Sequence, residues 1–204
     1  GVPWMSDSEM ALIKSSYGDL DIPAGETTGS YSSSDLANVS NGGTVYYQLT
    51  ASNLSGVEGR TDLTVADILP RVGDKVISGT DRGSEWPLTF SQITSVTKIA
   101  KDGTETPVEN YTLYFYDGNL DNAADYTNLF TTMDTATEGQ VPAGWHAGEP
   151  TNATKAFMLV TPRDICLAQG DSLVVQYEAT VNGGKDLEPE ILSGYSYNLS
   201  LIHI

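Results

Sequence analysis

Cysteine and basic residues are scarce in this chain of 204 residues, which contains one cysteine, Cys166, and ten Lys and Arg residues. A single cysteine excludes a disulfide framework and a paired-cysteine zinc site. We expect Cys166 to be a buried structural thiol, a common environment for a free cysteine. The sequence also lacks an apolar run of about 18 residues, the length that a membrane-spanning helix needs. Direct insertion into a membrane is therefore not expected.

The ten basic residues stand against 27 acidic residues, which gives a formal net charge of −17. A chain of this charge repels nucleic-acid phosphates, so nucleic acid is not expected as a partner. The acidic residues are spread along the sequence, which indicates a solvated surface and not a disordered acidic tail. The hydrolase, zinc-protease, P-loop and dinucleotide-binding motifs are all missing, so the sequence does not predict an enzyme that turns over a small-molecule substrate.

What the chain does contain is a series of short segments in which apolar and polar residues alternate between Gly, Asn, Asp, Ser and Pro. Such alternation is typical of half-buried β-strands. The expected strands cover residues 44–54, 63–69, 92–100, 111–116, 156–160, 172–181 and 195–204, with a hairpin turn at 101–103. They predict an all-β fold, a two-sheet Greek-key sandwich of immunoglobulin-like or adhesin type. We expect residues 1–204 to form one such domain, excised from a longer surface protein.

Two stretches do not have the pattern of strands. Residues 22–40 are rich in Gly, Ser and Thr and are expected to form a surface loop. Residues 117–153 form a long acidic loop insertion, within which Asn122–Met133 could hold a short helical turn. Long loops in compact domains often carry function, so this insertion is a candidate recognition surface.

Oxygen-bearing side chains alternate at the start of the insertion, as they do in calcium loops. An EF-hand would also need Gly at its sixth position and Glu at its twelfth, and asparagine occupies both. An irregular Ca²⁺ site remains as one interpretation, and a solvated acidic loop is the other. The candidate ligands are Asp117, Asn119, Asp121 and Asp125.

Four motifs occur in the order found in a known family. They are VxYxLTxxN at 45–53, ADILP at 66–70, YxATVN at 177–182 and GxxxNxxL at 194–201. In this order the chain resembles the isopeptide-forming D2-type domains of Gram-positive fimbrial proteins and cell-wall surface adhesins. The 117–153 insertion departs from the family's pattern.

The resemblance implies an amide bond between a lysine of the first strand and an asparagine of the last strand, promoted by an acid on a middle strand. The matching positions are Lys14, Asn198 and Asp67, and Lys14 is the only basic residue before Arg60. It further implies an extracellular, cell-wall-attached protein. Its partners would be neighbouring domains of the same chain and a protein or glycan on a host or neighbouring cell.

The chemistry of such a bond follows from the residue types. Burial lowers the pKa of a lysine and raises that of an aspartic acid, because each loses the solvation of its charged form. A free amine can then attack the carboxamide while the protonated acid polarises the amide and passes protons to the leaving ammonia. Folding supplies the proximity, so the reaction occurs once and without a cofactor.

Alternatives remain open at each position. Asn182 could replace Asn198 as the acceptor, and Glu178 could replace Asp67 as the acid. Each of the three residues could also be purely structural, as a solvated lysine, a strand-end carboxylate and a strand-edge amide. The alternative function is a glycan- or protein-binding module, the accessory domain of a secreted protein, that binds through residues 117–153.

Overall fold

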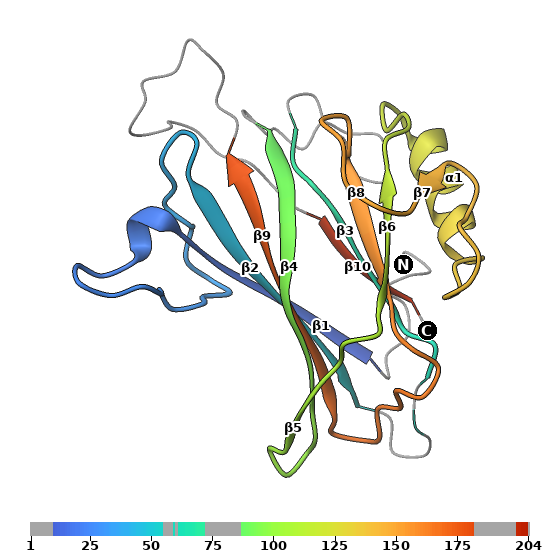
Figure 1. Ribbon diagram of the computed structural model, residues 1–204, viewed down its shortest axis with the longest axis horizontal. Helices are drawn as coiled ribbons and strands as arrows, with labels where there is room; N and C mark the ends of the chain where they lie inside the picture. The colour runs from blue at the N-terminus through green and yellow to red at the C-terminus, as the bar shows by residue number, and fades with distance from the viewer. Residues whose placement is uncertain (1–9, 55–58, 60, 72–86, 182–198, 204) are drawn as a thin grey trace.

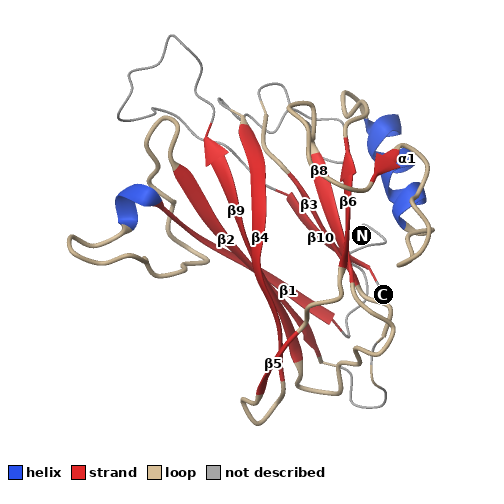
Figure 2. Ribbon diagram, in the orientation of Figure 1, coloured by secondary structure: helices blue, strands red, loops and turns tan. Residues whose placement is uncertain are grey.

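The computed structural model describes residues 10–54, 59, 61–71, 87–181 and 199–203, the last of these as backbone alone. Two five-stranded antiparallel sheets face each other (Figures 1 and 2). The first sheet has the order β1 (Met10–Gly18), β2 (Thr44–Asn53), β9 (Ser172–Val181), β4 (Leu88–Ile99) and β5 (Glu105–Pro107). The second has the order β10 (Leu199–His203), β3 (Thr64–Ile68), β8 (Ala156–Val160), β6 (Thr112–Tyr116) and β7 (Trp145–His146). This arrangement confirms the predicted two-sheet β-sandwich.

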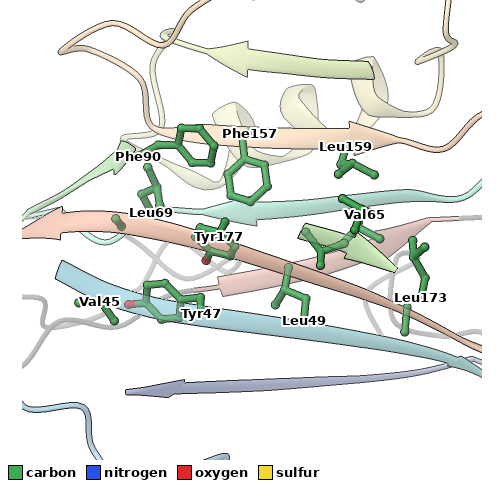
Figure 3. Close-up of a cluster of buried hydrophobic side chains, with 14 of the residues drawn as sticks. Val45, Tyr47, Leu49, Val65, Leu69, Phe90, Phe157, Leu159, Leu173 and Tyr177 are labelled. Atoms are coloured by element: carbon green, nitrogen blue, oxygen red, sulfur yellow. The ribbon is translucent and has the colours of Figure 1, made fainter. Parts of the chain in front are cut away.

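The main core lies between the sheets and follows from the alternation of residues along the strands. In β2 every second residue from Val45 to Asn53 is buried, and the residues between them are partly exposed. β9 pairs with β2 over nearly its whole length and contributes Tyr177 and neighbouring apolar residues on the same face. The second sheet adds Val65, Phe157 and Leu159 from the other side (Figure 3). Burial of these side chains stabilises the sandwich by about 25 cal/mol per Å² of apolar surface.

An α-helix, α1 (Ala123–Met133), forms a third layer on the outer face of the second sheet (Figure 1). It begins at Asn122, whose side chain accepts a hydrogen bond from the backbone N–H of Asp125. Its buried residues recur at helical spacing and pack on Tyr114, Met158 and their neighbours in the sheet. These residues are Tyr126, Leu129, Phe130 and Met133. The 117–153 insertion therefore holds a regular helix and strand β7, where the sequence predicted a loop with a helical turn.

The structure confirms one local expectation from the sequence and contradicts another. The hairpin after β4 is confirmed, with Gly103 at φ +91° and its N–H bonded to the carbonyl oxygen of Ala100. The expectation of a buried cysteine was wrong, because Cys166 is exposed in the connection between β8 and β9. The next residue, Leu167, occupies the buried position there. Within the described ranges, no helix is long and apolar enough to cross a membrane.

Candidate functional site

The two sheets bring Lys14 and Asp67 together in their interior. Lys14 lies on β1 opposite Leu49 of β2, and Asp67 lies on β3 opposite Phe157 of β8. The lysine Nζ is 3.1 Å from Asp67 Oδ1 and 3.0 Å from Oδ2. The preceding residue of β1, Ile13, is 54% exposed on the opposite face, as the alternation of side chains along a strand requires.

The surroundings of this pair are aromatic and mostly buried. The Asp67 side chain is fully buried, and that of Lys14 is 21% exposed. The amine lies 4.6 Å from the ring centroid of Tyr47, a cation–π contact. Tyr47 stacks on Tyr177 at 5.0 Å, and the Tyr177 hydroxyl donates a hydrogen bond to Asp67 Oδ2. Burying a carboxylate costs several kcal/mol unless a charge partner and hydrogen bonds compensate it, and Lys14 and Tyr177 supply both.

Asn198 and the alternative acceptor Asn182 lie outside the described residues. Leu199 is the first residue of β10, which pairs with β3 so that Ser200 is opposite Asp67. The alternative acid, Glu178, lies on the outer face of the first sheet, where it accepts a hydrogen bond from Gln92 at 3.1 Å. Lys14 is therefore brought to Asp67 and not to Glu178.

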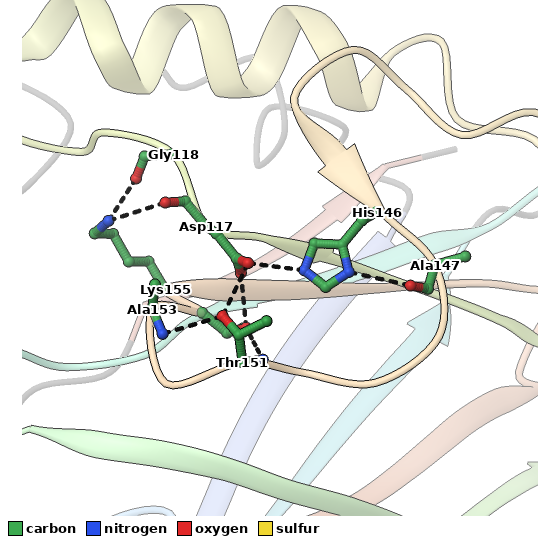
Figure 4. Close-up of polar contacts among 8 residues, drawn as sticks. Asp117, Gly118, His146, Ala147, Thr151, Ala153 and Lys155 are labelled. Carbon is green, nitrogen blue, oxygen red and sulfur yellow. Dashed lines mark hydrogen bonds and ion pairs between the residues drawn. The ribbon is translucent and has the colours of Figure 1, made fainter.

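A second polar cluster surrounds Asp117, at the end of β6 (Figure 4). Its carboxylate accepts hydrogen bonds from Thr154 at 2.7 Å and Thr151 at 2.9 Å, and it lies 2.9 Å from His146 Nε2. His146 Nδ1 is 3.1 Å from the carbonyl oxygen of Ala147. Because both of these neighbours are acceptors, both contacts are hydrogen bonds together only when the imidazole carries two protons. The contacts of His146 and Thr151 with Asp117 connect the later part of the 117–153 segment to the end of β6.

The four calcium candidates have separate roles in the structure. Asp117 binds the threonines and His146, whereas Asp125 accepts hydrogen bonds from the N–H groups that precede α1. The carbonyl oxygen of Asn119 accepts a bond from the Tyr116 hydroxyl, and Asp121 lies 3.8 Å from Arg71. Among the described residues there is no group of three or more His, Cys, Asp or Glu residues that could hold a metal ion.

Sequence reasoning missed the two tyrosines of the site. Tyr47 and Tyr177 both lie within the motifs that carry the resemblance, at 45–53 and 177–182. Strand alternation places each among buried apolar residues, which could have assigned both rings to the core. Nothing in the local sequence indicates that the Tyr177 hydroxyl meets Asp67, because 110 positions separate the two residues.

No family model and no curated protein matches the chain. Solved structures that resemble it include two from Clostridium thermocellum. One is a family 3a carbohydrate-binding module from the CipA scaffolding, with a TM-score of 0.36 and 11% identity over 84% of this chain and 76% of that one. The other is a CBM3a-L domain with flanking linkers from the cellulosomal scaffoldin CipA, with a TM-score of 0.37 and 10% identity over 93% and 84%. At these scores, function has to be argued from the chain's own residues.

Proposed function

We propose that the chain is a structural domain of a bacterial cell-surface or pilus protein, and that an amide bond between Lys14 and Asn198 cross-links it. The observation that supports this proposal is the Lys14–Asp67 pair, enclosed between the sheets with an amine 3.0 Å from a fully buried carboxylate. Ionisable pairs that are enclosed in the interior of a fold are frequent at functional sites. Asn198 immediately precedes β10, the strand that pairs with the strand of Asp67.

The reaction requires that one proton move within the pair, from the Lys14 ammonium to the Asp67 carboxylate. The free amine attacks Cγ of Asn198 while the Asp67 acid donates a hydrogen bond to the amide oxygen. Asp67 then gives its proton to Nδ2 and takes one from Nζ in its place, the Cγ–Nδ2 bond breaks, and ammonia leaves. One N–C bond forms and one breaks, so the reaction needs neither an oxidant nor a cofactor.

A bond between residues 14 and 198 would enclose most of the chain in one covalent loop. Tension transmitted between β1 and β10 would pass through the amide instead of through the intervening strands. The loop would also restrict the unfolded chain, as a disulfide does, by about 4–5 kcal/mol for loops of this size. A chain with a single cysteine would thereby gain this strength independently of redox conditions.

Intact-mass measurement of the purified chain tests the proposal. We expect a mass lower than that of the sequence by one ammonia. The variants Lys14→Met, Asn198→Ala and Asp67→Asn should restore the full mass of their own sequences. Asn182→Ala, the matched control, should still lose one ammonia. A wild-type chain of full mass would refute the cross-link, and loss of ammonia in Asp67→Asn would refute the role of Asp67.

Recognition of a glycan or protein through residues 117–153 is a second candidate function. The observation that favours it is the Asp117 cluster together with the buried face of α1, which hold the segment in one arrangement and leave Thr127, Asn128 and Thr131 exposed. Preorganised surfaces lose little entropy on binding. A glycan array probed with and without Ca²⁺ tests this function. Binding that Asn128→Ala abolishes would support it, and absence of binding to every glycan would refute the glycan form.

A further inference from the structure

Tyr177 brings a hydroxyl group into the most buried part of the sandwich. The residue lies in the middle of β9 and is fully buried. Its ring packs against Tyr47, Phe157 and Phe90, with centroids 5.0, 4.8 and 6.1 Å away (Figure 3). A phenylalanine would fill the same space between these rings without a polar atom. The hydroxyl therefore needs a reason beyond packing, since a buried polar group is costly unless it is hydrogen-bonded.

The partner of that hydroxyl is one particular oxygen of Asp67. The phenol donates to Oδ2, whereas the Lys14 amine lies at nearly equal distances from Oδ1 and Oδ2, 3.1 and 3.0 Å. The lysine does not distinguish the two oxygens, and the phenol does. An oxygen that accepts a hydrogen bond from the phenol is the less favourable place for the acid's own proton.

We propose that Tyr177 is a positioning residue for the cross-linking reaction, holding Asp67 so that Oδ2 stays an acceptor and Oδ1 carries the proton. This inference rests on the proposed function. The protonated Oδ1 is then the atom that donates a hydrogen bond to the amide oxygen of the acceptor, and once it has given its proton to the leaving nitrogen it takes the proton from Lys14 Nζ. The phenol keeps its own proton throughout and forms no covalent bond.

Holding the acid in one orientation increases the reaction rate, because a misplaced group in a preorganised site lowers the rate on the order of 10²-fold. The phenol also favours the charged carboxylate, since it donates a hydrogen bond to it. On the acid side of the pH profile, the pair binds a second proton and the lysine remains an ammonium that cannot attack. The phenol therefore extends the reaction to lower pH. A buried hydroxyl that donates elsewhere, such as that of Tyr114 to the Thr137 carbonyl, would not produce this effect.

The experiment follows bond formation in the full chain. Wild type, Tyr177→Phe and Tyr114→Phe are made by cell-free translation, quenched at timed intervals over a range of pH, and scored by intact mass for loss of ammonia. Tyr114 is the matched control, because its buried hydroxyl donates to the Thr137 carbonyl on the other face of the second sheet. We expect Tyr177→Phe to react about tenfold more slowly or worse, with its acid-side midpoint at higher pH. Tyr114→Phe should match wild type.

A further variant covers the case in which Tyr177→Phe does not fold. Tyr177→3-fluorotyrosine keeps the hydroxyl and makes it a stronger donor, so the acid-side midpoint should move to lower pH. If wild type loses ammonia and both Tyr177 variants keep its rate and midpoint, the role of Tyr177 is overturned while the cross-link stands. If wild type keeps its full mass, the proposed function itself fails.

Discussion

Lys14, on the edge strand of one sheet, holds its amine 3.0 Å from the carboxylate of Asp67, on the second strand of the facing sheet. The contact joins the two halves of the sandwich through their interior. It places a base and an acid where water has little access, because the carboxylate is fully buried. That relationship supports the proposed cross-link, and it has consequences for stability whether or not the bond has formed.

Lys14→Met is expected to reduce the free energy of unfolding strongly. In the cross-linked wild type Nζ is an amide nitrogen, so the variant loses the cross-link, about 4–5 kcal/mol. In an Asn198→Ala background the ammonium remains beside the buried carboxylate, and Lys14→Met, which preserves the apolar stem, should there cost about 3–5 kcal/mol. Urea unfolding in the two backgrounds measures the two contributions separately.

The control for this change is Lys98→Met. Lys98 lies 3.8 Å from Asp171 and its side chain is 29% exposed, so we expect a change of about 1 kcal/mol or less. Equal effects of the two lysine variants would mean that the interior pair has no special contribution.

Leu129→Ala tests whether α1 is an integral layer of the fold. The side chain is fully buried against the second sheet, so its truncation should cost about 2–5 kcal/mol. The exposed Thr127→Ala on the same helix should change stability by about 0.5 kcal/mol or less. Because the helix lies on the outer face of that sheet, Leu129→Ala should still lose one ammonia. A small effect in urea unfolding would show that the helix is dispensable.

The stability that Asp117 provides should depend on pH. Burial raises its pKa, but hydrogen bonds from Thr154 and Thr151 and the proximity of His146 outweigh burial, so the pKa lies below the usual 3.8. A lowered folded-state pKa gives stabilisation that is full above the unfolded-state value and is lost as pH falls through the folded-state value. Asp117→Asn should therefore destabilise the protein at neutral pH, and progressively less as the pH falls below 3.8 and through the folded-state pKa. Thermal unfolding over a series of acidic pH values and at neutral pH measures this difference. A constant difference would contradict the assignment.

The sequence predicted those elements whose pattern of apolar and polar residues lies within one continuous segment. The alternation in residues 44–54 and 172–181 predicted β2 and β9, because one face of each strand is buried and the other is more polar. The short strands β5 and β7 were missed, since segments of three and two residues are too short to show an alternation of apolar and polar residues. The length of α1 was underestimated because its apolar face recurs only over residues 126–133 and covers a sheet that sequence periodicity does not show.

The site was reached by a different route. Lys14 and Asp67 were chosen through the resemblance and not from periodicity, and 53 positions separate them. Their contact depends on how β1 and β3 face each other across the core, which no local pattern encodes. The hydroxyl of Tyr177 completes the site from a third strand, so its contribution required the three-dimensional arrangement.

Peptide mapping tests the cross-link most directly. Cleavage after glutamate gives one peptide of residues 10–26, which contains Lys14 as its only lysine, and one of residues 191–204, which contains Asn198 as its only asparagine. We predict a single branched peptide whose mass is the sum of the two less one ammonia, with fragment ions that locate the bond at Lys14 Nζ and Asn198 Cγ. Recovery of the two linear peptides at their full masses would contradict the account.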